Sequence, residues 1–251
     1  MVNFQKLDNL KQKLDSYHPL PWEIISKLRE DLVLRWTYNS NAIEGNTLTL
    51  KETKVVLEGI TIGGKTIREH FEAINHREAI YFVEELVKKQ EPLSEWQIKS
   101  IHQLILKNID DNNAGTYRKA NVIISGADHI PPDAVHVDSK MQNFIKWYQN
   151  EAQSLHPVER AGRMHADFVK IHPFTDGNGR TSRLLMNLEL MKEGFPPAIL
   201  PVEKRLQYYE ALDKAHTKND YESFLSLIAD IVESAFKPYW HALGMGQNLG
   251  W

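Results

Sequence analysis

The chain has 251 residues, of which 42% are hydrophobic and 25% are charged. This balance is typical of a globular protein of one domain, or of one domain with a small extension. The 30 Lys and Arg residues and the 33 Asp and Glu residues nearly balance, so we expect neither a nucleic-acid partner nor an anionic membrane partner. The absence of Cys excludes disulfides, thiolate metal sites and a Cys nucleophile.

The first residues carry no feature of a secretory signal. Residues 1–8 contain neither an apolar core segment nor a small-residue cleavage site. No window approaches the roughly 18 uninterrupted apolar residues that a membrane-spanning helix needs. We therefore expect a cytoplasmic protein that does not span a membrane, and the lack of Cys is compatible with a reducing compartment.

Most of the chain is predicted to be helical. Capping boxes, in which a Ser or Thr is followed three positions later by Glu or Gln, precede apolar stripes at 49–57 and 94–105. Residues 219–222 (NDYE) have a similar pattern and are expected to open a third helix. Residues 180–193 are apolar nearly all round, so they predict a central helix that ends at Gly194.

Residues 59–66 (GITIGGKT) match the spacing of a phosphate-binding P-loop. A P-loop follows a buried parallel strand, whereas residues 50–58 follow a capping box and are predicted to be helical. The rest of the chain shows no alternation of strands and helices. We therefore do not expect this segment to bind nucleotide, and a P-loop NTPase remains an alternative that a Lys65 variant can test.

One region departs from the helical pattern. Residues 117–137 contain a short β-branched run at 122–124, followed by a Ser-Gly turn signal and a pair of prolines. This combination predicts a short β-hairpin, or an extended flap, within a mainly α protein.

Residues 172–183 (HPFTDGNGRTSR) gather groups that are suited to phosphate chemistry. Gly177 and Gly179 flank Asn178 just before a predicted helix, so the backbone can approach a ligand closely. The unpaired N–H groups of a helix start point at such a ligand and bind anions. The segment therefore predicts an anion site at this helix N-terminus.

Four charged or titratable side chains complete this segment. Arg180 and Arg183 are three positions apart and project from one face of the first helical turn, where two guanidinium groups make a polyphosphate site. Asp176 offers a hard carboxylate oxygen that suits Mg²⁺, and His172 can act as a general base near neutral pH. Together they predict attack of a hydroxyl on a nucleotide phosphate.

The segment resembles the signature of the Fic family, His-x-Phe-x-(Asp/Glu)-Gly-Asn-Gly-Arg-x-x-Arg, at every fixed position, and the resemblance extends from about residue 36 to residue 231. It implies a Fic-type helical bundle that transfers AMP from ATP to a Ser, Thr or Tyr hydroxyl of a target protein and of itself. It also implies Mg²⁺ or Mn²⁺ as cofactor and, because relatives often dimerise, a homodimer.

The resemblance also implies a role for each matching residue. His172 would deprotonate the target hydroxyl, and Asp176 would bind the metal that bridges the α- and β-phosphates. The anion hole would comprise Gly177, Asn178 and Gly179, with Arg180 on the β-phosphate, Arg183 on the γ-phosphate and Phe174 as a core anchor. Fic-related kinases of the toxin type have Lys in place of Gly179, so this glycine favours AMP transfer over phosphate transfer.

Residues 40–46 (SNAIEGN) resemble the inhibitory motif of Fic proteins, (Ser/Thr)-x-x-x-Glu-(Gly/Asn), and lie N-terminal to the core as in one class of the family. On a helix, Ser40 and Glu44 are one turn apart on the same face, and Gly45 is a natural stop. We expect Glu44 to pair with Arg183 and so to occupy the guanidinium that the γ-phosphate needs.

The resemblance further implies a target-binding flap and an adenine pocket. The flap strand Val122-Ile123-Ile124 would hold the target segment as an added β-strand. The adenine pocket would be lined by Tyr208, Tyr209 and His216. Relatives often have Asn at the last of these positions.

The expected organisation has three parts. An N-terminal helical region, 1–90, carries the inhibitory helix at about 35–45, the Fic core spans 91–236, and a C-terminal tail spans 237–251. Two further functions stay open beside AMP transfer and the P-loop NTPase. One is removal of AMP from a modified protein with the help of the same Glu44, and the other is a non-catalytic module that binds peptides at the flap.

Overall fold

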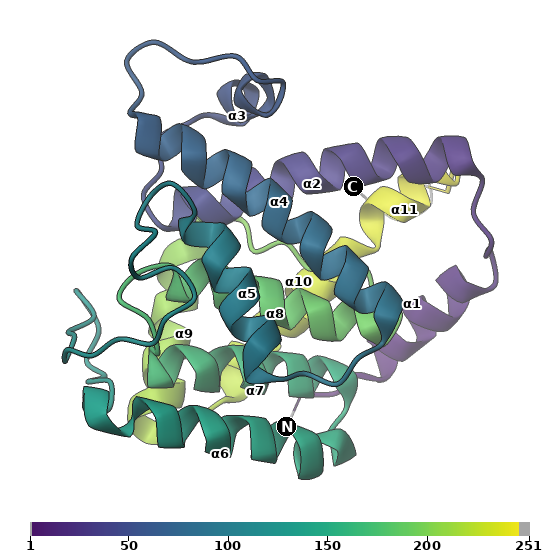
Figure 1. Cartoon of the computed structure of the whole chain (residues 1–251). Helices are drawn as coiled ribbons and strands as arrows, with labels where there is room; N and C mark the ends of the chain where they lie inside the picture. Colours follow the sequence, from purple (N-terminus) through teal and green to yellow (C-terminus); the bar gives the residue numbers. More distant parts are fainter. Residues whose placement is uncertain (1, 246–251) are drawn as a thin grey trace.

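The computed structural model describes residues 2–245, which form eleven α-helices and three short 3-10 helices (Figure 1). The α-helices are α1 (Gln5–Asp15), α2 (Trp22–Ile43), α3 (Leu50–Leu57), α4 (Ile67–Lys89), α5 (Glu95–Leu106), α6 (Val137–Asn150), α7 (Pro157–Ile171), α8 (Asn178–Lys192), α9 (Arg205–Lys218), α10 (Glu222–Ala235) and α11 (Lys237–Ala242). The 3-10 helices are η1 (Ala134–His136), η2 (Ala152–Ser154) and η3 (Val202–Lys204). The prediction of a mainly α protein is confirmed. None of the described helices is long and apolar enough to cross a bilayer.

Helix α8 is central, as its apolar sequence predicts. It packs against α7 on one side and against α4 and α5 on the other (Figure 1). Met186 and Leu190 belong to an apolar cluster shared with α7, α9 and α10, whereas Leu184 and Leu185 belong to a second cluster shared with α4, α5 and α6. Burial of both faces of α8 fixes its N-terminus, where residues 172–183 form the candidate site.

The capping boxes predicted at Thr49 and Ser94 are confirmed at the starts of α3 and α5. A further box, which the sequence analysis missed, joins Thr66 to Glu69 at the start of α4. The box predicted at residues 219–222 is wrong. Asn219 ends α9 in the left-handed conformation, with φ of 54°, which Asn tolerates better than most residues, so α10 begins only at Glu222.

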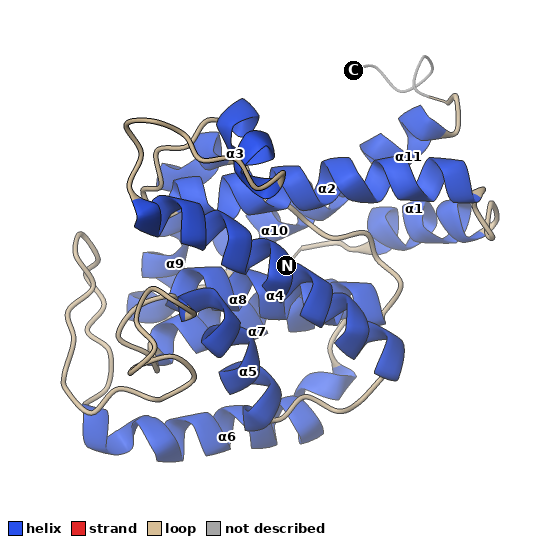
Figure 2. Ribbon diagram, turned by 45° about the horizontal axis from the view of Figure 1, so that its top comes forward, coloured by secondary structure: helices blue, strands red, loops and turns tan. Residues whose placement is uncertain are grey.

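The predicted β-hairpin flap is also wrong. Within residues 2–245 the structure has no strand, and residues 122–124 lie in an irregular loop (Figure 2). The returning arm of this loop contains Pro131 and Pro132, which have no N–H to donate to a ladder. Side chains close the base of the loop instead, because Arg118 donates to the carbonyls of Ala120 and Pro132.

The expected inhibitory helix is the C-terminal end of α2, which begins at Trp22 and is therefore longer than expected. Glu44 directly follows the last helical residue, and Gly45 has a φ of 99°, as a glycine stop requires. At the other end of the chain, the expected tail begins with α11, which packs on α2. Residues 246–251 of that tail lie outside the described residues.

Candidate active site

The loop between α7 and α8 is shaped by two left-handed residues, His172 with φ of 51° and Gly177 with φ of 76°. The side chain of Asn178 spans this loop. Its Oδ1 atom accepts from the Phe174 amide at 3.0 Å, and its Nδ2 atom donates to the Phe174 carbonyl at 2.8 Å. The Asn178 side chain therefore stabilises the loop. The backbone N–H of Asn178 has no partner within the helix, because it lies in the first turn of α8, and it is available to bind an anion.

His102 of α5, a residue outside the sequence motif, packs against the loop. Its ring stacks on buried Phe174 with 3.5 Å between the ring centroids, and Nε2 lies 2.9 Å from the Asp176 carbonyl. The Gly115 amide donates to Nδ1 at 2.9 Å, so both ring nitrogens are used. Phe174 is thus a core anchor, as expected, and His102 positions the loop with it.

A cavity of about 260 Å³ lies beside the loop and brings together side chains from distant parts of the chain. The predicted site residues that line it are Glu44, Ile124, His172, Gly179, Tyr208, Tyr209 and His216. Val122 and Ile123 of the expected flap do not line the cavity, and Ile123 is 87% exposed.

His172 ends α7 with its side chain against this cavity. Burial lowers the pKa of the imidazole to about 4, with a smaller contribution from the charge of Arg118. The ring is therefore neutral at physiological pH and can accept a proton. Arg118, which the sequence analysis did not single out, also fixes the residue, because its Nε donates to the His172 carbonyl at 2.8 Å.

The ion pair expected between Glu44 and Arg183 is present. Arg183 Nη2 donates to Glu44 Oε1 at 2.7 Å and to the Ser40 carbonyl at 2.8 Å, and Nε donates to Ser40 Oγ at 3.0 Å. The Arg183 side chain is 3% exposed and the Glu44 side chain is 33% exposed. Glu44 lines the cavity and Arg183 does not, so the carboxylate covers the guanidinium.

Gly179 is in close contact with this ion pair. A Cβ atom at residue 179 would lie 2.2 Å from Glu44 Oε1 and 3.1 Å from Arg183 Nη1. The absence of a side chain therefore lets the carboxylate rest on the first turn of α8, at the helix end that favours negative charge.

Asp176 does not line the cavity, and its carboxylate has three partners. Its Oδ1 atom accepts from the Gly177 amide at 2.6 Å and from Arg180 Nη2 at 3.1 Å, and Oδ2 accepts from Arg68 Nη2 at 2.5 Å. Burial opposes the negative charge of Asp176, but Arg180, the Gly177 amide and Arg68 outweigh it and hold the pKa of the carboxyl below its usual range. Asp176 is therefore ionised at physiological pH.

The fit of Mg²⁺ or Mn²⁺ depends on this one carboxylate. Among residues 2–245 no group of three or more His, Cys, Asp or Glu side chains could hold a metal ion. Mg²⁺ commonly keeps several waters and binds through one or two carboxylates plus phosphate oxygens. Asp176 fits an ion that enters together with a nucleotide, and it does not fit a resident ion held by protein ligands alone.

Three buried guanidinium nitrogens lack a hydrogen-bond partner among the described residues. They are Arg180 Nε, Arg180 Nη1, which is only in ion-pair distance of Glu72, and Arg183 Nη1. Buried polar groups are nearly always hydrogen-bonded, and an unpaired charged donor is especially unfavourable. Arg180 and Arg183 lie on the first two turns of α8, so the oxygens of an anionic ligand bound at this helix end can satisfy these nitrogens.

The three residues expected in the adenine pocket have different surroundings. The hydroxyl of buried Tyr208 lies 2.8 Å from His165 Nε2, and that of Tyr209 donates to the Ile43 carbonyl at 3.1 Å. His216 is buried with Nε2 2.9 Å from the Ala166 carbonyl. His216 thus joins α9 to α7, whereas Tyr209 lines the cavity and remains half-exposed.

The P-loop-like segment does not form a P-loop. Residues 59–66 are the irregular connection between α3 and α4, with a helix rather than a strand before them. Lys65 Nζ donates to the Thr47 carbonyl at 2.6 Å and lies 3.7 Å from Glu52 Oε2. Lys65 therefore ties this connection to the turn after α2.

We expect Lys65→Ala to bind ATP as the wild-type chain does, because Lys65 contacts none of the residues that line the cavity. Equilibrium dialysis with radiolabelled ATP measures the dissociation constant, and Arg183→Ala is the matched variant within the site. A weakening of about ten-fold or more for Lys65→Ala, at unchanged thermal stability, would restore the P-loop hypothesis.

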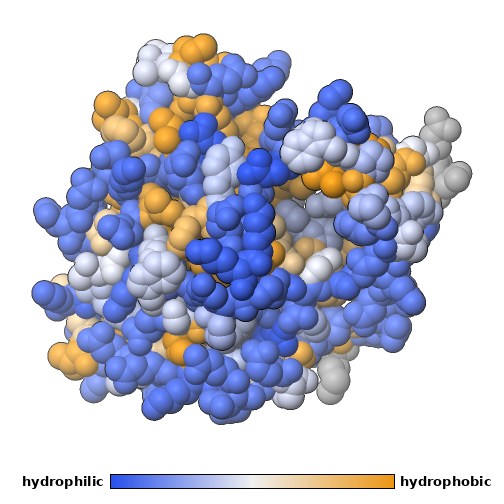
Figure 3. Space-filling model, turned by 45° about the vertical axis from the view of Figure 1, so that its right-hand side comes forward, coloured by the Kyte–Doolittle hydropathy of each residue, from blue (hydrophilic) through white to orange (hydrophobic). Residues whose placement is uncertain are grey.

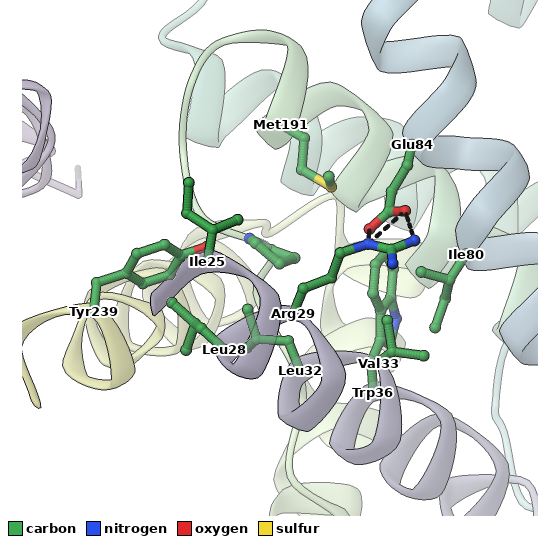
Figure 4. A pocket seen from close by; sticks show the side chains of 11 residues that line it. Ile25, Leu28, Arg29, Leu32, Val33, Trp36, Ile80, Glu84, Met191 and Tyr239 are labelled. Carbon is green, nitrogen blue, oxygen red and sulfur yellow. Dashed lines mark hydrogen bonds and ion pairs between the residues drawn. The ribbon is translucent and has the colours of Figure 1, made fainter. Parts of the chain in front are cut away.

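A second cavity, of about 180 Å³, lies between α2, α4 and α11 (Figure 4). Trp36, Ile80 and Tyr239 supply its apolar wall, and Arg29 and Glu84 form a bidentate ion pair at its rim (Figure 4). No residue of the 172–183 segment lines it. The apolar lining does not suit a nucleotide triphosphate. On the face that Figure 3 shows, hydrophobic residues form small patches between hydrophilic ones.

Comparison with known families finds that residues 92–190 match the model of the Fic/DOC family. A protein adenylyltransferase Fic of Nematostella vectensis is 37% identical over 240 residues, which are 94% of this chain and 56% of that protein. The one of Drosophila persimilis is 34% identical over 98% of this chain and 48% of its own length. The chain spans about half the length of the curated relatives it matches.

Solved structures agree over nearly the whole chain. Fic-1 from C. elegans, residues 134–508, superposes with a TM-score of 0.88 at 33% identity, covering 96% of this chain and 72% of that one. A Fic domain containing signaling protein from Bacteroides thetaiotaomicron superposes with a TM-score of 0.87 at 28% identity, covering 94% and 96%. The similarity thus includes the N-terminal helices as well as the segment of residues 172–183.

Proposed function

Because the chain belongs to the Fic/DOC family, we propose that it transfers AMP from ATP to a Ser, Thr or Tyr hydroxyl of a target protein and of itself. One observation carries this proposal. Neutral His172 lines the same cavity as Gly179, and α8 begins beside them with two buried arginines, each of which keeps at least one guanidinium nitrogen without a hydrogen-bond acceptor. The names of the curated relatives, protein adenylyltransferase Fic, support the same chemistry.

His172 is the general base in this proposal. As the hydroxyl oxygen bonds to the α-phosphorus, Nε2 takes the hydroxyl proton, the bond between the α-phosphorus and the bridging oxygen breaks, and pyrophosphate leaves. The N–H groups of the first turn of α8 and the guanidinium groups of Arg180 and Arg183 balance the charge on the phosphates. Catalysis of this kind depends mainly on positioning and charge.

Asp176 would hold Mg²⁺ or Mn²⁺ against the α- and β-phosphates. The ion, when bound, would supply positive charge to the leaving pyrophosphate. The remaining ligands would be phosphate oxygens and waters, since the motif offers one carboxylate. The fixed Gly177 amide, 2.6 Å from Oδ1, holds the carboxylate in place.

Glu44 would inhibit this reaction. Its carboxylate covers Arg183 and rests on Gly179, where the γ-phosphate of a productive nucleotide would lie. ATP could still bind, but its triphosphate would be displaced and its α-phosphate aimed away from His172. Release of Glu44 would therefore be the step that activates the enzyme.

The target protein would bind at the loop of residues 117–133. Ile124 lines the cavity and Ile123 is exposed, so the loop connects the site to the surface. Among the described residues, no backbone partner is hydrogen-bonded to Val122 or Ile123. An incoming extended segment could pair with these free groups, even though the loop itself is not a strand.

Removal of AMP from a modified protein is the second candidate. The specific observation that favours it is that the Glu44 carboxylate lines the same cavity as His172, where it could orient an attacking water. Transfer and removal use the same residues but respond oppositely to loss of Glu44. A non-catalytic peptide-binding module would leave the ionised Asp176 and the neutral His172 without a role.

We expect incubation with ATP and Mg²⁺ to add an AMP group to the chain itself, and to proteins of a lysate, with the Glu44→Gly variant as the active form. Intact-mass spectrometry measures the adduct, and ATP labelled at the α-phosphate identifies its source. His172→Ala is the matched inactive control. A phosphate adduct, or label transferred from the γ-phosphate, would overturn the assignment and the argument from Gly179.

A further inference from the structure

Arg68 contacts the carboxylate that we assign to the metal. It lies on the first turn of α4, 108 positions before Asp176, and α4 packs beside α8 (Figure 1). Its Nη2 atom lies 2.5 Å from Asp176 Oδ2, and the two side chains are 56% and 43% exposed. The signature of residues 172–183 does not include Arg68.

A second carboxylate orients this guanidinium. Glu72, one turn further along α4, accepts from Arg68 Nε at 3.2 Å and lies 3.3 Å from Arg180 Nη1. Its other oxygen accepts from Asn46 Nδ2 at 2.9 Å. Asn46 follows Glu44 by two positions, so the contacts of Arg68 continue to the end of the inhibitory helix.

We propose that Arg68 occupies the cation position on Asp176 in the resting enzyme, so that a divalent ion binds fully only when Arg68 leaves. This inference rests on the proposed role of Asp176 as metal ligand. Mg²⁺ requires near-octahedral geometry at about 2.0–2.1 Å from its ligand oxygens. A guanidinium on the same carboxylate repels the ion and occupies one of the lone-pair directions that the ion needs.

Two ion pairs would then stabilise the resting state. Glu44 covers the guanidinium of Arg183, and Arg68 covers the carboxylate of Asp176, with Glu72 and Asn46 between them. Loss of the contact between Glu44 and Arg183 would weaken the contact between Arg68 and Asp176, and the reverse, because Glu72 contacts both Arg68 and the turn after α2. Divalent ion and nucleotide would therefore enter together.

We expect Arg68→Ala to lower the dissociation constant of Mn²⁺ by about two- to five-fold, the range for loss of an exposed ion pair. The probe is Mn²⁺ with a non-hydrolysable ATP analogue, and electron paramagnetic resonance counts the free ion without any turnover. The difference from wild type should shrink in 1 M salt, which screens exposed charges. Arg68→Lys retains the positive charge and should stay closer to wild type.

Arg35→Ala is the matched control, because Arg35 is an equally exposed arginine in an ion pair with Asp31 on α2. It should bind Mn²⁺ as wild type does. Asp176→Ala tests the role of Asp176 as metal ligand separately from the role of Arg68. If it binds Mn²⁺ as tightly as wild type, Asp176 is not the ligand and the proposed function of this residue fails.

If Asp176→Ala loses the ion while Arg68→Ala binds it as wild type does, or more weakly, the role of Arg68 is overturned and the metal assignment stands. Weaker binding would show instead that Arg68 helps to hold the phosphates. Thermal melting of each variant, followed by circular dichroism, confirms that the compared proteins are folded.

Discussion

His172→Ala is expected to lower the rate of AMP transfer by about 10²–10⁴-fold while leaving ATP binding unchanged. The imidazole takes a proton only as the hydroxyl attacks, so its loss affects the transition state and not the bound nucleotide. The rate is measured with α-labelled ATP in the Glu44→Gly background, where we expect the highest activity, and binding is measured by equilibrium dialysis. Labelling at the unchanged rate would show that His172 is not the base.

His172→Asn is the sharper variant, because residue 172 has a φ of 51° and Asn tolerates this left-handed conformation. It keeps a polar side chain at the end of α7 but cannot act as the base. If His172→Ala is inactive and His172→Asn retains activity, the loss in the Ala variant comes from the disturbed turn.

The pH dependence gives an independent test. Burial lowers the pKa of His172 to about 4. A base with a depressed pKa is deprotonated, and therefore competent, at every pH above that value. We expect kcat/KM of the Glu44→Gly enzyme to be nearly constant from pH 8 down to about pH 5 and to fall as the pH approaches 4. A fall centred near pH 6.5 would indicate an imidazole that titrates as it does in water.

The sequence was sufficient where short-range chemistry decides the structure. The glycine and arginine spacing of residues 172–183 predicted a helix N-terminus, and α8 begins there. The spacing of Ser40 and Glu44 predicted one helical face, and both residues contact Arg183, which lies 139 positions beyond Glu44. The contact itself was predictable only through the resemblance to a family.

The sequence was insufficient where a long-range partner decides. A β-branched run at 122–124 predicts a strand, but a strand needs a neighbour, and the prolines of the returning arm prevent one. Arg68, His102 and Arg118 each support the 172–183 loop from another element. No local pattern marks these residues, because a single arginine or histidine outside a motif is common in any chain.

Glu44→Gly is expected to raise the rate of AMP transfer by about ten-fold or more. A hydrogen bond between charged groups contributes about 1.5–3 kcal/mol, which corresponds to about 10- to 150-fold in an equilibrium. We expect the lower part of this range, because the Glu44 side chain is 33% exposed and water screens the pair. Removal of the Glu44 carboxylate frees Arg183, and it also removes the repulsion between that carboxylate and the triphosphate.

Glu44→Gln separates charge from helix stability. Glu44 follows the last residue of α2 rather than lying inside the helix, so neither variant removes a helical residue, and loosening of α2 should be small. We therefore expect Glu44→Gln to activate nearly as much as Glu44→Gly. The remaining difference would come from the Gln side chain, which still lies over Gly179. Activation by Gly alone would indicate steric cover, and activation by neither would show that the end of α2 is structural.

The Glu44→Gly variant also decides between addition and removal of AMP. The substrate is Glu44→Gly protein that has modified itself with labelled AMP, and wild-type enzyme is then added without ATP. If the main activity is transfer, the label stays on the substrate and the variant is the faster enzyme in the forward assay. If wild type releases AMP and Glu44→Gly does not, Glu44 orients the attacking water, because a carboxylate that only covers Arg183 would slow both directions alike.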